Sequence, residues 1–293
     1  MEHRSQKQRI LRILRIGARA YVIAYLVGVL GLAIFQRHLM YLPERSTEAA
    51  ILDKARLYGG VPWRNAQGTI IGWKRANKLG KTAANRLIVF HGNAGNALDR
   101  MPYSEGFEKL DGGALWEVYL FEYPGYGARP GPISEADFKN AGAAAMAQLR
   151  SEDSRPIYIA GESVGSGLAC AMAHDNAATV KGLLLVTPFS SMADAAASHF
   201  QLVPVRLLIR DRWNNMAMLP AFHGPLAVIL AGADTIVPPA LGKQLFAAGN
   251  EPKRLWVMPG VDHNDIDFSL DAGWWQEVSD FLLSPKRGAQ KLN

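Results

Sequence analysis

Short apolar runs alternate with amphipathic segments along most of the chain. Compact apolar runs that suit buried strands occur at residues 68–74, 86–90, 116–121, 156–160, 181–186, 225–231 and 254–258. Segments with helical periodicity follow several of these runs, at residues 134–149, 166–173, 240–248 and 271–283. Strands that alternate with helices favour an α/β fold with a mostly parallel, twisted sheet and helices on both faces.

The N-terminal segment has a different pattern. Residues 20–35 are uncharged and almost entirely apolar (AYVIAYLVGVLGLAIF). As a helix they rise about 24 Å, and the preceding Arg19 can extend this length toward the ~30 Å of a hydrocarbon core by snorkelling. We therefore predict a transmembrane anchor at residues 20–36. A buried helix of a soluble protein and a cleaved signal peptide are the alternatives, although no small-residue cleavage pair follows the run.

Charge is concentrated at the same end of the chain. The net charge is +6, and residues 1–19 contain six arginines and lysines against Glu2 alone. The rest of the chain is close to neutral, which disfavours a nucleic-acid-binding surface. The positive-inside rule predicts a cytoplasmic basic tail at residues 1–19. The bulk of the chain then lies on the opposite side of the membrane, which is the periplasm in a Gram-negative bacterium.

Residues 192–224 show no strand pattern but carry many apolar side chains: Phe200, Leu202, Val205, Leu207, Leu208, Trp213, Met216, Met218 and Leu219. They lie between two predicted strands. We predict a helical cap here that contributes to a substrate pocket, within a globular domain at residues 38–285. Residues 286–293 are predicted to be a C-terminal tail.

The sequence GESVGSG at residues 161–167 places a serine between a predicted strand and a predicted helix. Glycines at 161 and 165 leave the space that a strained strand-to-helix turn needs, and the turn exposes the Ser163 hydroxyl near the helix N-terminus. This is the pattern of a nucleophile elbow, although ordinary turns also contain G-x-S-x-G.

Two further residues follow predicted strands, Asp234 after residues 225–231 and His263 after residues 254–258. Because parallel strands end at one edge of a sheet, we expect these side chains to lie close to Ser163. The chain order Ser, Asp, His fits a triad in which His263 is the base and Asp234 orients it. Four neighbouring candidates are interpreted as structural instead: His91, Asp262, Asp265 and Asp267.

Other chemistry has little support in the sequence. The single cysteine, Cys170, excludes an internal disulfide and lies in the helix after the serine, which favours a packing role. The sequence has no Cys/His cluster of zinc spacing, no P-loop and no dinucleotide-binding glycine motif. The predicted reaction needs neither a metal nor an organic cofactor.

Five motifs together resemble the α/β-hydrolase superfamily over about residues 38–285: FHGNAGN (90–96), EYPGYG (122–127), GESVGSG (161–167), GADTIVPP (232–239) and GVDHND (260–265). Their combination looks like its membrane-anchored branch, which includes eukaryotic lysophospholipid lipases and protein depalmitoylases. The resemblance implies a catalytic triad and an oxyanion hole, the latter formed by the N–H groups of Asn93 and Val164. It also implies a serine hydrolase that cleaves esters or thioesters with acyl-chain or lipid substrates.

Two other functions stay open. A serine peptidase of the prolyl-oligopeptidase type shares this fold, but it usually carries an additional domain, for which this chain has no room. A non-catalytic scaffold with the hydrolase fold is the second alternative. The presence of Ser163, Asp234 and His263 together disfavours it.

Overall fold

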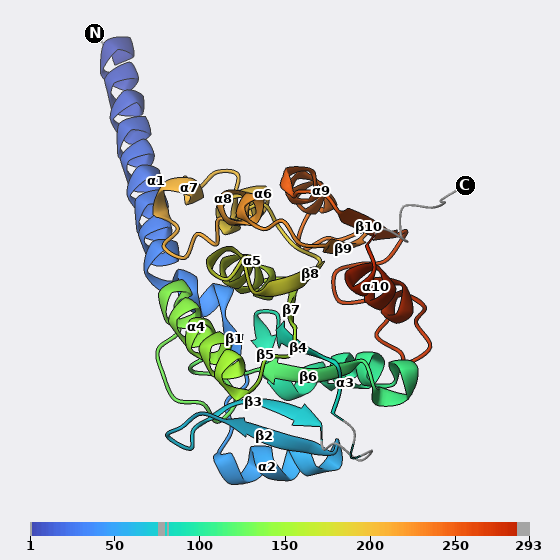
Figure 1. The fold of residues 1–293 in the computed structure, drawn as a ribbon. Coiled ribbons are helices and arrows are strands. Elements are labelled where there is room, and N and C mark those ends of the chain that lie inside the picture. The colour runs from blue at the N-terminus through green and yellow to red at the C-terminus, as the bar shows by residue number, and fades with distance from the viewer. Residues whose placement is uncertain (1, 76–79, 81, 286–293) are drawn as a thin grey trace.

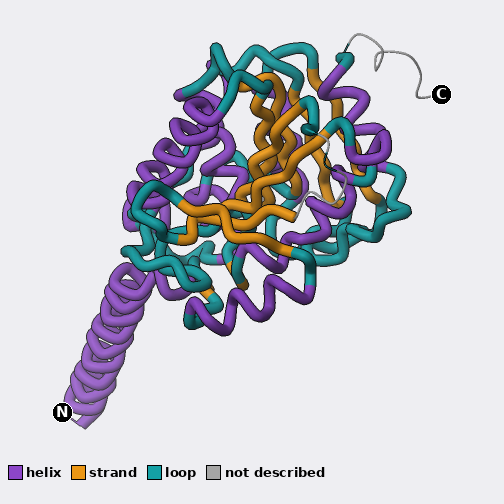
Figure 2. Tube along the Cα trace, turned by 60° about the horizontal axis from the view of Figure 1, so that its bottom comes forward, coloured by secondary structure: helices purple, strands orange, loops and turns teal. Residues whose placement is uncertain are grey.

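A mostly parallel sheet forms the centre of the computed structural model, which describes residues 2–75, 80 and 82–285, with side chains from Gln8 onward. The strand order is β10-β9-β8-β7-β4-β6-β3-β2, and only the β2–β3 and β3–β6 pairs are antiparallel. Figure 2 shows the twist of this sheet. Its strands are β2 (Gly60–Arg64), β3 (Ile70–Arg75), β4 (Asn85–Phe90), β6 (Trp116–Phe121), β7 (Ile157–Glu162), β8 (Val180–Val186), β9 (Leu226–Ala231) and β10 (Lys253–Met258).

Helices cover both faces of the sheet, which confirms the predicted fold class (Figure 1). Ile88 and Phe90 of β4 join the core on one face, whereas Leu87 and Val89 join the core on the other. The strand is therefore apolar at four consecutive positions, from Leu87 to Phe90, rather than alternating. The first face carries α4 (Glu135–Glu152), α5 (Gly165–Asp175) and α9 (Pro239–Ala248), and the second carries α2 (Glu48–Leu57), η1 (Ala97–Arg100), α3 (Met101–Glu108), η2 (Leu110–Gly113) and α10 (Trp274–Leu283).

One long helix, α1 (Glu2–Met40), precedes the sheet and projects from the rest of the molecule (Figure 1). It includes the one helix stretch among the described residues that is long and apolar enough to cross a membrane, Gln8–Met40. The predicted boundaries at residues 19, 36 and 38 do not coincide with any break in α1. No proline interrupts the helix, so its hydrogen-bond ladder continues until Met40. A two-stranded sheet of β1 (Leu42–Pro43) and β5 (Ala94–Gly95) follows directly.

The segment predicted as a cap has two parts. Helix α7 (Val205–Leu208) stands beside α1, as Figure 1 shows, and α6 (Met192–His199) packs on α7. Helix α8 (Asn215–Met218) and η3 (Leu219–Ala221) instead pack on α5. Trp213 is fully buried, and its indole lies where a Cβ on Gly167 of α5 would clash. The apolar character of the second part therefore reflects core packing. The tail predicted at residues 286–293 lies outside the described residues.

Close packing between α3 and α10 generates a test of the fold. A Cβ at Gly106 would lie 2.4 Å from the buried Trp275 ring, whose N–H is fixed on the Ser269 carbonyl oxygen. We expect Gly106→Ala to lower the free energy of unfolding by about 1–2 kcal/mol, because overpacking outweighs the gain in helix propensity. Urea unfolding of the detergent-solubilised protein measures this loss.

The matched control is Gly273→Ala at the start of α10. A Cβ there meets nothing within 4 Å, so the urea concentration at the midpoint of unfolding should hardly change. Equal midpoints for wild type and Gly106→Ala would contradict the packing argument.

Candidate active site

Ser163 lies on a strained turn between β7 and α5. Its φ is +51°, a left-handed conformation that few residues other than glycine adopt. The flanking glycines make this turn possible by sterics. A Cβ at Gly161 would lie 2.5 Å from the Ala169 Cβ, and one at Gly165 would lie 2.0 Å from the Phe90 carbonyl oxygen. Only glycine therefore fits at positions 161 and 165, on either side of the serine, as a nucleophile elbow requires.

The structure brings the three predicted triad residues into one hydrogen-bonded chain. The His263 Nε2 atom lies 3.0 Å from Ser163 Oγ, and its Nδ1 atom lies 2.7 Å from Asp234 Oδ2. The other oxygen, Asp234 Oδ1, accepts hydrogen bonds from the backbone N–H groups of Ile236 and Val237. These bonds fix the carboxylate so that Oδ2 faces the imidazole. The three residues follow the carboxyl ends of β7, β9 and β10, as strand order predicts.

Asp262 lies next to the histidine in sequence but makes no hydrogen bond with its ring. Its carboxylate accepts hydrogen bonds from the Thr235 N–H, the Thr235 hydroxyl and the His263 backbone N–H. The Thr235 N–H, first among these groups, lowers the pKa of Asp262. The residue therefore joins the Asp234 loop to the His263 loop.

None of the other structural candidates hydrogen-bonds to the Ser163 hydroxyl or to the His263 ring. His91 is buried against the Tyr123 ring, and its Nδ1 lies 2.8 Å from the Gly92 carbonyl oxygen. Asp267 accepts a hydrogen bond from the Ser269 N–H. Asp265 donates its backbone N–H to the Asp262 carbonyl oxygen. All three positions organise loops.

The two residues predicted to form the oxyanion hole lie beside the serine. Asn93 follows β4, and Val164 precedes α5 as its N-cap residue. Within the described part of the chain, neither backbone N–H donates a hydrogen bond to the protein. Both residues also line the same cavity as Ser163. Two unengaged N–H groups near a nucleophile are what stabilisation of a developing oxyanion needs.

An apolar cavity of about 280 Å³ opens beside Ser163. Ser163, Val164 and Asn93 are among its lining residues. The first part of the cap contributes Met192, Ala195, Phe200, Val203, Leu208 and Ile209. Five residues of α1 also line it, namely Leu32, Ala33, Gln36, Leu39 and Met40. The sequence predicted that the cap contributes to a pocket but did not predict the part of α1, because the uniformly apolar run in α1 gives no sign of which face is covered.

A second, more polar cavity of about 200 Å³ is lined by His263. Arg100 and Glu162 line it as a bidentate ion pair with N–O distances of 2.8 and 2.7 Å. Thr187 also lines this cavity, and only 2% of the residue is exposed. Its hydroxyl has no hydrogen-bond partner among the described residues. The sequence did not predict this cavity, because Glu162 lies within the G-x-S-x-G motif at a position that the motif leaves open, and no motif marks Arg100 or Thr187.

The part of the chain that the structure describes has no group of three or more His, Cys, Asp and Glu side chains that could hold a metal ion. Cys170 is buried in α5, and burial raises the pKa of its thiol. This environment fits the packing role inferred from its position in the sequence.

Comparison with known proteins identifies the family. Residues 87–227 match a family model described as the Alpha/beta hydrolase family. An uncharacterised protein of Mycobacterium tuberculosis is 35% identical over 237 residues, which cover 78% of this chain and 81% of that protein. A lysophosphatidylserine lipase of Danio rerio is 25% identical over 251 residues, which cover 76% of this chain and 64% of the lipase.

A solved structure supports the same fold. An esterase of Pyrococcus furiosus superposes with a TM-score of 0.61 at 16% identity, covering 83% of this chain and 98% of the esterase. The fold, the elbow geometry and the relatives lead to one family. The chain belongs to the alpha/beta hydrolase family.

Proposed function

We propose that this protein is a membrane-anchored serine hydrolase that cleaves carboxylic ester or thioester bonds. The observation that carries the proposal is the chain from Ser163 Oγ to His263 to Asp234, with separations of 3.0 and 2.7 Å. This chain ends at a cavity that holds two unengaged backbone N–H groups. Such an arrangement activates a hydroxyl and receives the negative charge of acyl transfer.

In the acylation step, the Ser163 Oγ attacks the substrate carbonyl carbon while His263 Nε2 takes the hydroxyl proton. Asp234 holds the Nδ1–H tautomer and stabilises the imidazolium. The N–H groups of Asn93 and Val164 bind the tetrahedral oxyanion, each worth about 3 kcal/mol by comparison with measured oxyanion-hole losses. The carbon–oxygen or carbon–sulfur bond then breaks, and His263 gives its proton to the leaving group.

Water completes the reaction by the reverse use of the same groups. His263 takes a proton from water as it attacks the acyl carbon, and the bond between that carbon and Ser163 Oγ breaks. The histidine returns its proton to the serine. The released product is a carboxylic acid.

The two cavities support an amphiphilic ester as substrate. The acyl part would occupy the apolar cavity, because the oxyanion groups line that side. The leaving alcohol or thiol would face the polar cavity, where the Thr187 hydroxyl has no protein partner among the described residues. The Danio rerio relative is named a lysophosphatidylserine lipase, and lysophosphatidylserine is an amphiphilic ester.

Helix α1 supports attachment to a membrane. The stretch Gln8–Met40 has the length and hydropathy of a spanning helix. Arg9, Arg12, Arg15 and Arg19 precede its apolar part, whereas Arg37 alone follows within α1. This asymmetry favours a cytoplasmic N-terminus and a hydrolase domain on the opposite side.

The first prediction concerns the nucleophile. We expect Ser163→Ala to lose ester hydrolysis by several orders of magnitude and to lose labelling by a fluorophosphonate probe. The fold should survive, because glycines rather than the hydroxyl make the turn possible. Hydrolysis of p-nitrophenyl butyrate equal to wild type, in a variant with an unchanged circular dichroism spectrum, would refute the catalytic role.

The second prediction separates the two neighbouring carboxylates. We expect Asp234→Asn to lower kcat by about 10⁴, because the amide favours the wrong histidine tautomer. Asp262→Asn is the matched control and should change kcat much less, since Asp262 contacts only backbone and Thr235. Steady-state kinetics on one short ester distinguishes them, and the reverse order of losses would move the triad acid to Asp262.

The third prediction concerns orientation in the membrane. A C-terminal alkaline phosphatase fusion should be active and a C-terminal cytoplasmic fluorescent reporter dark, because the basic end of α1 stays in the cytoplasm. An Arg-poor variant with Arg9, Arg12, Arg15 and Arg19 replaced by Gln should weaken this preference. A bright fluorescent fusion with inactive phosphatase would reverse the proposed topology.

A further inference from the structure

One face of α1 is packed against the domain. Leu32, Ala33, Gln36 and Met40 are half-buried and recur at helical spacing, while Ile34 and Phe35 beside them are exposed. The residues of α1 that line the apolar cavity, Leu32, Ala33, Gln36, Leu39 and Met40, are called the α1 stripe below. The helix therefore presents a specific face to the site.

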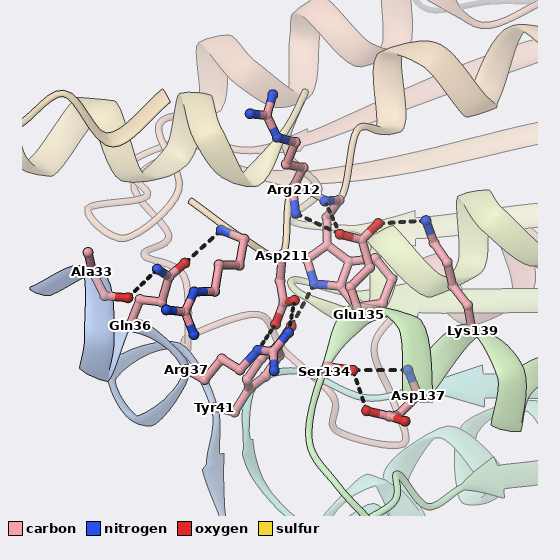
Figure 3. A network of polar contacts seen from close by, with 12 residues as sticks. Ala33, Gln36, Arg37, Tyr41, Ser134, Glu135, Asp137, Lys139, Asp211 and Arg212 are labelled. Atoms are coloured by element: carbon pink, nitrogen blue, oxygen red, sulfur yellow. Dashed lines mark hydrogen bonds and ion pairs between the residues drawn. The ribbon is translucent and has the colours of Figure 1, made fainter. Parts of the chain in front are cut away.

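Polar contacts hold α1 against the cap, as Figure 3 shows. The Gln36 amide donates to the Leu208 carbonyl oxygen and accepts from the Arg210 N–H, at 3.2 and 2.7 Å. The Arg37 guanidinium makes a bidentate ion pair with Asp211 at 2.9 and 2.8 Å. The Asp211 side chain is only 3% exposed, so these contacts lie within a packed junction. They fix both the rotation and the height of α1 relative to the cap.

The end of α1 is also bonded directly to the candidate oxyanion loop. The Asn93 side-chain amide donates to the Met40 carbonyl oxygen at 3.1 Å. The Leu42 N–H donates to the Asn93 carbonyl oxygen at 2.9 Å, which continues the connection into β1. The α1 stripe thus ends at Met40, which is bonded to one of the two candidate oxyanion residues.

The cap reaches far along the apolar part of the helix. The Tyr25 hydroxyl donates to the Leu202 carbonyl oxygen at 2.6 Å, and Gln36 contacts Leu208. Eleven residues of α-helix separate these two points, which is about 16 Å. Leu202 and Leu207 are 84% and 82% exposed at this level, beside the segment that we propose spans the bilayer. Exposed apolar side chains there are suited to lipid rather than water.

We propose that α1 is a wall of the acyl-chain pocket, and that one acyl chain of a bilayer lipid enters between α1 and the cap to reach Ser163. This inference rests on the proposed function and adds where the chain lies and which residues select its length. The occupant is a lipid chain because the cavity is lined mainly by apolar side chains, continues to the nucleophile and is bounded by the helix proposed to lie in the membrane. The anchor is then part of the specificity machinery.

Ala33→Trp tests the proposed wall, because the larger side chain fills part of the cavity that Ala33 lines. We measure kcat/KM of the full-length protein in detergent for p-nitrophenyl esters from acetate to dodecanoate. Wild type should prefer medium or long chains. The variant should lose about tenfold or more on the dodecanoate, because each methylene in an apolar pocket is worth roughly 10–200-fold. Its acetate hydrolysis should fall less than its dodecanoate hydrolysis, because the two-carbon acyl group fills little of the cavity, so the ratio of the dodecanoate rate to the acetate rate should drop by about tenfold or more.

Two further variants make the result specific. Ile34→Trp adds the same side chain one residue away, on the exposed side of α1 and at the same depth, and should leave the chain-length profile unchanged. Leu32→Ala enlarges the cavity and should shift the optimum to longer chains. Misfolding cannot produce that shift, so this variant decides the question even if Ala33→Trp folds poorly.

The outcomes separate the two proposals. Wild type that hydrolyses no ester would overturn the proposed function and this inference together. Wild type that is active but loses rate steadily beyond the shortest chains would overturn the acyl pocket. Wild type with a long-chain optimum that Ala33→Trp and Leu32→Ala both leave unchanged would overturn only the α1 wall.

Discussion

The junction between the end of α1 and Asn93 links the membrane-proximal helix to the chemistry of the site. Asn93 uses its side-chain amide on Met40 and its carbonyl oxygen on Leu42 and on the Tyr126 hydroxyl. These bonds leave its backbone N–H unengaged within the described chain and hold that N–H beside Ser163. If α1 moved, the candidate oxyanion loop and the lining of the apolar cavity would move with it. The positions of α1, the Asn93 loop and the apolar cavity are therefore coupled.

The sheet supplies the second half of this arrangement. Strands β7, β9 and β10 end at one edge and deliver Ser163, Asp234 and His263 to neighbouring positions. Backbone N–H groups of the Asp234 loop fix the carboxylate, and Asp262 joins that loop to the histidine loop. Rigid secondary structure thus places the polar groups, while α1 and the cap shape the apolar space around them. This division explains how a shared fold can carry different substrate preferences.

Much of the fold followed from local pattern. Continuous apolar runs predicted the parallel strands within one or two residues, because strands buried on both faces need apolar side chains at every position. The glycines around Ser163 predicted a tight turn, and the structure gives that serine a φ of +51°. Strand ends also predicted that Asp234 and His263 would lie near it. The catalytic roles of these residues stay predictions.

The local sequence pattern could not predict which side chains contact one another in the folded chain. Trp213 is apolar like Phe200, yet one is fully buried against α5 and the other lines the cavity. In α1, Ala33 and Ile34 are both apolar, and only docking decides which of them faces the site. The Arg100–Glu162 pair joins residues 62 positions apart, and no local motif marks Arg100. Composition gives the number of apolar side chains, whereas their partners depend on the packed structure.

A structure of the protein covalently labelled with a long-chain alkyl fluorophosphonate tests the central claim most directly. The account predicts a bond between Ser163 Oγ and phosphorus, with a phosphonyl oxygen bound by the N–H groups of Asn93 and Val164. The alkyl chain should lie along Leu32, Ala33 and Met40. A phosphonyl oxygen turned away from both N–H groups, or an alkyl chain that leaves the site without contacting α1, would contradict it.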